Sequence, residues 1–313
     1  MVIEESTIES GGDRQRRVDR IEWLIHEDIG RNIGALCAAA RGGLWRGAAA
    51  LAAGEPGAIG LITGFYVPQA SPPAAETDGP VGAALLARGF SRIGRDCRLA
   101  TDLPCRNACA AALAAAGAQT APIDSPAVGA SLDPLVATWR ACGITTAIAI
   151  ERCGKSADGA PRNMRGQDIS DHTAPLDVLF LAGPWRTIAI GDGGNEIGMG
   201  ALPRSLIARN VDNGGAIACV TPANHLIVAG VSNWGAYALL AALALLRPDW
   251  RRPLTDCLDE TLDRRILETM VREGPAVDGV SRAQTPTVDN LPLAVHHEKL
   301  RQIRALVTGA DES

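Results

Sequence analysis

The chain has 313 residues, of which 47% are hydrophobic and 21% are charged. This balance is typical of a soluble globular protein that buries a core without disulfides. The formal net charge of −5 argues against a nucleic-acid or anionic-membrane partner, because such partners are bound by an excess of Lys and Arg.

The N-terminal segment carries acidic residues where a secretory signal would have a basic region and an apolar core. We expect residues 1–18 to be a flexible leader and residues 19–313 to form a single domain. The eight cysteines are scattered without a C-x-x-C pair, a usage that predicts buried free thiols in the reducing cytoplasm. The longest apolar run, residues 237–246, is too short to span a bilayer.

Short apolar segments alternate with Ala- and Leu-rich segments along the chain, which is the rhythm of β-α-β units. Strands are expected at residues 58–65, 97–102, 144–151, 187–192 and 216–221. Helices are expected at residues 81–93, 104–116, 134–142, 195–210, 231–246, 255–272 and 293–307. Because the strands are apolar throughout, the sequence predicts an α/β fold with a doubly wound, mostly parallel sheet and helices on both faces.

Polar residues follow the expected strands, and ligands bind beyond the carboxyl ends of the strands in such a fold. These residues are Asp78, Glu151, Lys155, Asp192, Asn195, Glu196, His225 and Asn233. For any one of them a solvated loop or a helix cap is the commoner explanation. Polar residues at so many strand ends together indicate a binding site for a small molecule.

Residues 191–200, GDGGNEIGMG, place two carboxylates in a glycine-rich turn after an apolar strand. A dinucleotide-binding GxGxxG does not fit, because its third glycine would fall on Glu196, and no GK[ST] follows to make a P-loop. No nucleotide or organic cofactor is therefore expected. The GDGxND element of haloacid-dehalogenase-type phosphatases is closer, but the aspartate nucleophile that this chemistry requires is missing upstream.

Four motifs, in this order, resemble the D-glutamate cyclase family: ETDGPVGAALLARGF (76–90), ERCGKSADGAPRNMRGQDIS (151–170), GDGGNEIGMG (191–200) and TPANHLIVAGVSNWGAYAL (221–239). The resemblance extends from about residue 30 to residue 292. It implies a lyase that dehydrates D-glutamate to 5-oxo-D-proline, in which the amine attacks its own γ-carboxyl group and water leaves.

Ring closure requires the ammonium to be deprotonated, the γ-carboxylate to be polarised and the departing oxygen to be protonated. Asp192 and Glu196 are the expected ligands of Mg²⁺ or Mn²⁺, although capping of a helix start would explain either one alone. Lys155 is expected to bind or polarise a substrate carboxylate and His225 to act as general acid or base, unless they are a surface lysine and a structural histidine. The residues expected to bind the substrate are Asn32, Asp78, Glu151, Asn195 and Asn233.

Two other functions remain open from the sequence. One is a metal-dependent hydrolase or phosphatase of a small acidic metabolite. The other is a non-catalytic protein that binds an acidic amino acid and has lost the chemistry. The sequence also leaves the oligomeric state open, including a homo-oligomer.

Overall fold

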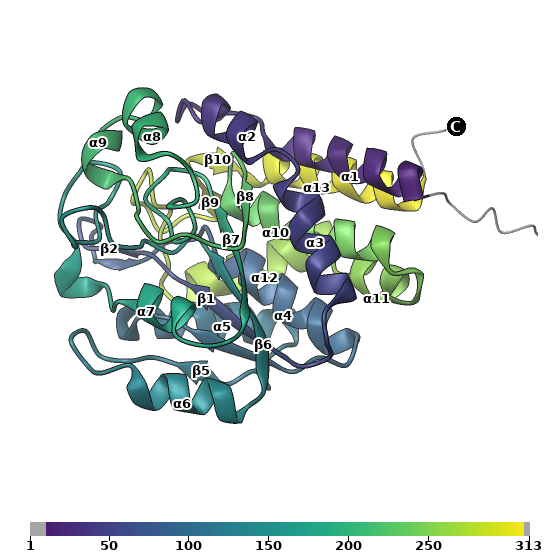
Figure 1. Cartoon of the computed structure of the whole chain (residues 1–313). Coiled ribbons are helices and arrows are strands. Elements are labelled where there is room, and N and C mark those ends of the chain that lie inside the picture. The colour runs from purple at the N-terminus through teal and green to yellow at the C-terminus, as the bar shows by residue number, and fades with distance from the viewer. Residues whose placement is uncertain (1–10, 310–313) are drawn as a thin grey trace, which may run out of the picture.

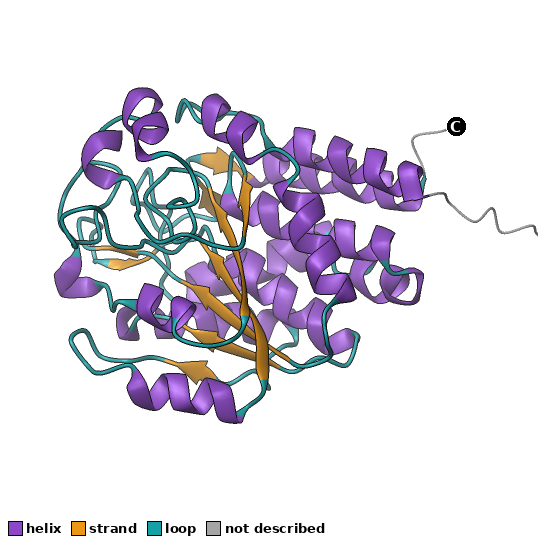
Figure 2. Cartoon of the chain, in the orientation of Figure 1, coloured by secondary structure: helices purple, strands orange, loops and turns teal. Residues whose placement is uncertain are grey.

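A computed structural model describes residues 11–309 and has a parallel sheet between two layers of helices (Figures 1 and 2). The sheet has six strands in the order β5-β4-β1-β6-β7-β8, and every neighbouring pair is parallel. The strands are β1 (Ala58–Thr63), β4 (Cys97–Ala100), β5 (Ile123–Asp124), β6 (Ile144–Ile150), β7 (Arg186–Gly191) and β8 (His225–Val228). The predicted doubly wound α/β fold is confirmed.

The helices divide into two groups that cover opposite faces of the sheet. The larger layer contains α1 (Gly11–Ile25), α3 (Gly43–Ala53), α4 (Pro80–Arg92), α5 (Arg106–Ala116), α10 (Ser232–Leu246), α11 (Arg251–Thr255), α12 (Glu260–Glu273) and α13 (Leu293–Thr308). The smaller layer contains α2 (Gly34–Ala40), α6 (Asp133–Ala141), α7 (Leu176–Leu181), α8 (Arg204–Asn210) and α9 (Gly214–Ile217). Two short antiparallel pairs, β2 (Tyr66–Val67) with β3 (Ala74–Ala75) and β9 (Thr287–Val288) with β10 (Leu291–Pro292), lie outside the main sheet.

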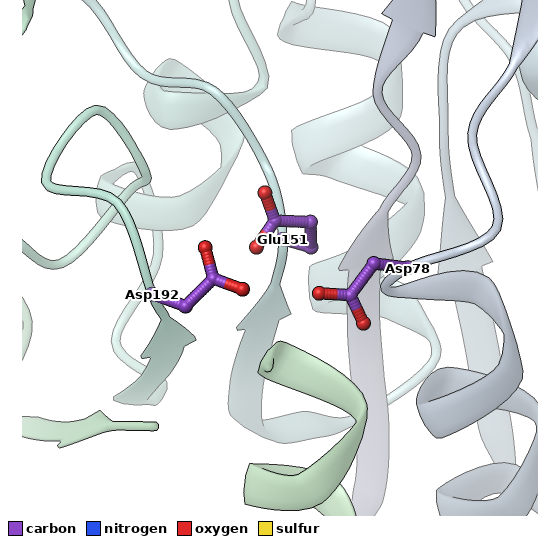
Figure 3. Close-up of side chains that lie close together, drawn as sticks. All are labelled: Asp78, Glu151 and Asp192. Atoms are coloured by element: carbon purple, nitrogen blue, oxygen red, sulfur yellow. The ribbon is translucent and has the colours of Figure 1, made fainter. Parts of the chain in front are cut away.

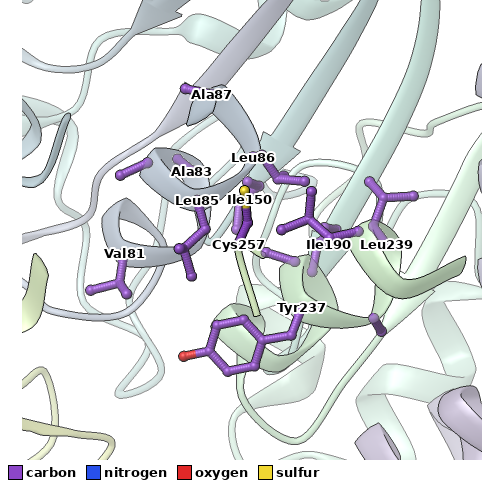
Figure 4. Close-up of a cluster of buried hydrophobic side chains, with 14 of the residues drawn as sticks. Val81, Ala83, Leu85, Leu86, Ala87, Ile150, Ile190, Tyr237, Leu239 and Cys257 are labelled. Carbon is purple, nitrogen blue, oxygen red and sulfur yellow. The ribbon is translucent and has the colours of Figure 1, made fainter. Parts of the chain in front are cut away.

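Alternate residues of each strand supply the two cores, because successive side chains of a strand point to opposite faces. In β6, Ile148 and Ile150 face the larger layer, whereas Ala147 and Ala149 face the smaller one. Figure 4 shows Ile150 with residues of α4 and α10 in the larger core. Helix α10 is apolar all round and almost wholly buried, as a central helix of such a layer is. Within residues 11–309, no helix is both long and apolar enough to cross a membrane.

The path of the chain through the sheet reverses between β1 and β6. From β1 the chain adds β4 and β5 on one side, and it then returns to add β6, β7 and β8 on the other. In chain order this is 3-2-1-4-5-6, the strand order of the dinucleotide-binding folds. The crevice at the carboxyl ends of β1 and β6 is therefore the place where this topology favours a ligand.

Two predicted elements after β7 were wrong. Residues 216–221 do not form a strand but the end of α9 and a loop, and the last strand of the sheet is β8. The helix expected at residues 195–210 begins only at Arg204. Gly194 and Gly198 have φ angles of +98° and +103°, which no right-handed helix contains.

Helix α1 begins at Gly11, so residues 11–18 of the expected leader are helical. Val18, Ile21 and Ile25 lie on one face and are fully buried, a helical spacing that the many charges of this segment conceal. Residues 1–10 of the expected leader lie outside the described residues.

Gly60, in the middle of β1, tests how tightly the smaller layer packs. A Cβ at this position would overlap the ring of the buried Trp139. We therefore expect Gly60→Ala to lower the free energy of unfolding by about 1–3 kcal/mol, measured by urea denaturation. Gly34→Ala in α2 is the control, because its Cβ would meet nothing within 4 Å; an equal loss in both variants would contradict the argument.

Candidate active site

Three carboxylates converge beyond the carboxyl ends of β1, β6 and β7 (Figure 3). Asp78 precedes α4, Glu151 directly follows β6, and Asp192 directly follows β7. One oxygen from each lies within 4.8 Å of the others, although the side chains are only 3%, 7% and 1% exposed. This cluster lies at the crevice that the strand order favours.

The backbone at Glu151 and Gly79 adopts conformations that bring these carboxylates together. Glu151 has a φ of +43°, a left-handed conformation that is unusual for a non-glycine residue and often marks a functional site. Gly79 has a φ of +91°, and a Cβ there would lie 2.7 Å from Oγ1 of Thr63 and 2.8 Å from Cβ of Glu151. The Asp-Gly pair at 78–79 is therefore required by the close approach of two strand ends.

The N-terminus of α10 points at the cluster. The backbone N–H of Ser232 donates to Asp78 Oδ2 (2.9 Å) and Asp192 Oδ2 (3.1 Å), and the Ser232 hydroxyl donates to Glu151 Oε2 (2.6 Å). The N–H of Asn233 donates to Asp78 Oδ1 (2.9 Å). The first N–H groups of a helix have no partner within the helix, so these N–H groups and the helix dipole favour negative charge at this point.

Asn233 also connects α10 to α4. Its Oδ1 accepts hydrogen bonds from the N–H groups of Gly79 (3.0 Å) and Gly82 (2.8 Å) at the start of α4. Asp78 therefore caps α10 while Asn233 caps α4. This reciprocal capping gives Asn233, expected to bind substrate, a structural role beneath the cluster.

Arg31 also contacts the cluster. Its Nη1 lies 2.9 Å from Asp192 Oδ2, and its Nη2 lies 2.5 Å from Asp289 Oδ1. Asp289 and Asn290 have φ angles of +55° and +61° and form the two-residue turn of the β9–β10 hairpin, a position where Asp and Asn are favoured. Asp289 was not predicted as a site residue; the D-N pair between two short apolar segments was the available signal.

The cluster borders a cavity of about 360 Å³. Arg31, Glu76, Glu151, Asp192 and Asp289 are among its lining residues. Burial raises the pKa values of Glu76, Asp78, Glu151 and Asp192, that of Asp78 to about 7; neighbouring carboxylates raise them further, and Arg31 partly opposes the shift. The positive charge of Arg31 and the dipole of α10 therefore compensate only part of the negative charge of these carboxylates.

This excess of buried carboxylate fits a divalent cation. Hard oxygen ligands suit Mg²⁺ and Mn²⁺, and Asp78, Glu151 and Asp192 could hold one. Because the folded-state pKa of Asp78 is raised, the stability of the metal-free protein should fall as the pH rises from about 4 toward about 7. A bound cation would supply the positive charge that the carboxyl groups lose when they release their protons.

Glu196 stabilises the turn that carries Asp192. Its Oε1 accepts from the N–H groups of Asp192 (3.2 Å) and Gly193 (2.6 Å), and its Oε2 accepts from the N–H of Gly194 (2.7 Å). The two carboxylates of GDGGNE are thus separated in role: the side chain of Glu196 folds back onto the backbone, while Asp192 points into the cluster. The sequence predicts that Asp192 and Glu196 bind one metal ion together; in the structure Glu196 instead bonds to the backbone of the turn.

The structure does not bring Lys155, His225 or Asn32 to the cluster. Nζ of Lys155 lies 3.6 Å from Asp177, beside a separate small cavity. His225 begins β8 level with Ile188, four residues before Asp192, so it lies about 13 Å from that end of the sheet at about 3.3 Å per residue. The side chain of Asn32 is exposed.

Two further residues belong to the cavity. Asn195 is buried in its lining, and its Nδ2 donates to the carbonyl oxygen of Arg162 (2.8 Å). Glu76 was not predicted as a site residue. It is 8% exposed, and its Oε1 has no hydrogen-bond partner within residues 11–309.

The comparison with known protein families identifies the chain. A model of the family described as "D-glutamate cyclase-like, C-terminal" matches residues 21–304. The chain belongs to this family. A human protein named "D-glutamate cyclase, mitochondrial" is 44% identical over 103 residues, which are 32% of this chain and 17% of the human protein. The match thus covers about one sixth of that relative. The family model confirms, at the level of the family, the resemblance seen in the sequence motifs.

Asp192→Asn and Glu196→Gln test which carboxylate binds metal. We expect Mn²⁺ to stabilise the unmodified protein by about 2.7 kcal/mol at a hundred-fold excess over Kd and Asp192→Asn to remove most of this gain. Glu196→Gln should keep the gain but cost about 1–3 kcal/mol of stability, because a backbone N–H loses its acceptor. Thermal unfolding with Mn²⁺ and with EDTA measures both; equal loss of the metal response would make Glu196 a ligand.

Proposed function

We propose that this protein dehydrates D-glutamate to 5-oxo-D-proline. The observation that carries the proposal is the buried cluster of Asp78, Glu151 and Asp192 at the crevice of the sheet, in a chain of the D-glutamate cyclase-like family. The cavity of about 360 Å³ beside it has the size of a small-molecule site.

The reaction closes a ring within one molecule. A bond forms between the amine nitrogen and the γ-carbon, one carbon–oxygen bond breaks, and two protons of the ammonium leave with that oxygen as water. Because both reacting groups belong to the same molecule, holding glutamate in a folded pose supplies much of the rate enhancement. Arg31 is the proposed contact of a substrate carboxylate, and its bond to Asp289 fixes its direction.

A metal ion would be held by Asp78, Glu151 and Asp192. When bound, Mg²⁺ or Mn²⁺ would polarise the γ-carboxylate and reduce its negative charge. Asp192 and Glu151 line the cavity, and we propose that one of them accepts a proton of the substrate ammonium. We propose Glu196, Asn233 and Asn195 as residues that hold this arrangement.

Glu76 is the proposed general acid. It lines the cavity, and its Oε1 accepts no hydrogen bond within the described chain. Burial, followed by the charges of Glu151 and Asp289, raises the pKa of its carboxyl group well above the ordinary value. A carboxyl group whose pKa is raised keeps its proton to a higher pH than an ordinary carboxyl group does, and it can donate that proton to the departing oxygen.

The eight cysteines are free thiols, seven of them buried. This pattern supports a reducing compartment. We propose that the protein works in the cytoplasm.

Incubating the purified protein with D-glutamate, with and without Mn²⁺, tests the activity. We expect 5-oxo-D-proline, detected by chiral chromatography, and a loss of roughly 10²-fold or more in Asp192→Asn, since one side chain of a polarising site typically contributes that much. Glu268→Gln, at an exposed position of α12, is the matched control and should remain active.

Other outcomes of this assay separate the remaining functions. Tight binding of D-glutamate without product in either condition would favour a non-catalytic binding protein. Release of phosphate from a panel of small acidic phosphate esters, without 5-oxoproline, would favour a metal-dependent phosphatase.

Glu76→Gln tests the general acid. An acid must be protonated to act, so activity should be present below the raised pKa of Glu76 and fall as the pH rises through it. In Glu76→Gln we expect kcat to fall roughly 10²- to 10⁴-fold and the alkaline fall to disappear from the residual activity. An unchanged kcat with an unchanged pH profile would show that Glu76 is not the acid.

A further inference from the structure

A second cavity lies at the opposite end of the sheet, at the amino ends of β6, β7 and β8. Its volume is about 610 Å³. Arg95, Arg186 and His225 are the basic residues of its lining, and Glu55 is its carboxylate. The side chain of Glu55 is exposed, and within residues 11–309 it forms no ion pair with either arginine.

Arg95 is a buried guanidinium without a negatively charged partner. Its side chain is 8% exposed; Nε donates to the carbonyl oxygen of Gly57 (2.9 Å) and Nη2 to the hydroxyl of Thr145 (3.1 Å). Both acceptors are neutral, and in residues 11–309 no carboxylate pairs with Arg95. Burial accordingly lowers the pKa of this side chain. A buried charge without a counter-charge is costly.

Arg186 and His225 add to the positive character of the same cavity. Nη1 of Arg186 donates to the carbonyl oxygen of Ala50 (2.7 Å), and this arginine too forms no ion pair within the described chain. Nδ1 of His225 is buried and has no hydrogen-bond partner there. Burial, followed by the charges of Arg186 and Arg46, lowers the pKa of His225.

We propose that this cavity is a binding site for a small oxyanion, a phosphate or carboxylate group of a metabolite. The planar guanidinium groups of Arg95 and Arg186 have the geometry that carboxylate and phosphate oxygens accept. The oxyanion supplies the counter-charge that Arg95 lacks and an acceptor for a protonated His225. The site is separate from the acidic cavity at the carboxyl ends of the strands, which has the opposite charge.

Binding is measured by calorimetry with inorganic phosphate in one arm and citrate in the other, with chloride at matched ionic strength as the blank. We expect saturable binding in at least one arm and a loss of at least tenfold in affinity in Arg186→Gln. Arg186 is used because it is half-buried, whereas Arg95→Gln removes two internal hydrogen bonds. The control is Arg264→Gln, an exposed position of α12, which should bind as the unmodified protein does.

A second readout follows His225 itself. Its ring pKa, measured by NMR with His225→Gln for assignment, should rise by about one unit when the anion is bound, since a nearby negative charge favours the imidazolium form. Binding in the phosphate arm alone or the citrate arm alone identifies the chemical class of the ligand. Absence of saturable binding in both arms, or binding that Arg186→Gln leaves unchanged, would overturn the proposal.

Discussion

The contact between the N-terminus of α10 and three buried carboxylates is the constraint on which the site depends. Ser232 bonds to Asp78, Glu151 and Asp192 at once, so one helix end joins the ends of β1, β6 and β7. The dipole of a buried helix compensates part of the negative charge. The same contact fixes α4, because Asn233 caps it in return. Scaffold and site are therefore one hydrogen-bonded unit.

Charge decides what this unit can bind. Carboxylates buried together raise one another's pKa values. A cation in contact with them lowers the free-energy cost of burying their negative charge. Arg31 supplies one positive charge and is held by the hairpin turn at Asp289. The remaining excess of negative charge suits a cationic ligand, and Asp78, Glu151 and Asp192 could hold a divalent cation. At the opposite end of the sheet the imbalance is reversed, because Arg95 and Arg186 form no ion pair with a carboxylate in the described part of the chain.

Local pattern in the sequence was sufficient for four of the six strands of the sheet, although not for β5 and β8, and for the principal acidic residues. Four strands were predicted within two residues of their observed ends because apolar runs bounded by turns are a local signal. Asp78, Glu151 and Asp192 could be expected together because each lies in the connection that follows the carboxyl end of a predicted parallel strand. Glu196 could not be separated from Asp192 in this way, since both stand in the same turn and only the direction of the side chain distinguishes them.

The sequence by itself determined the α/β class, the family and the edge of the sheet where the acidic residues meet, because these follow from periodicity, motif order and strand direction. Only the tertiary structure decided the rest. His225 belongs to the amino ends of the strands because the last strand is β8, not residues 216–221. Asp289 and Arg31 are 258 residues apart and meet through a hairpin. Contacts between segments so distant in the chain depend on how whole layers pack, which no local pattern encodes.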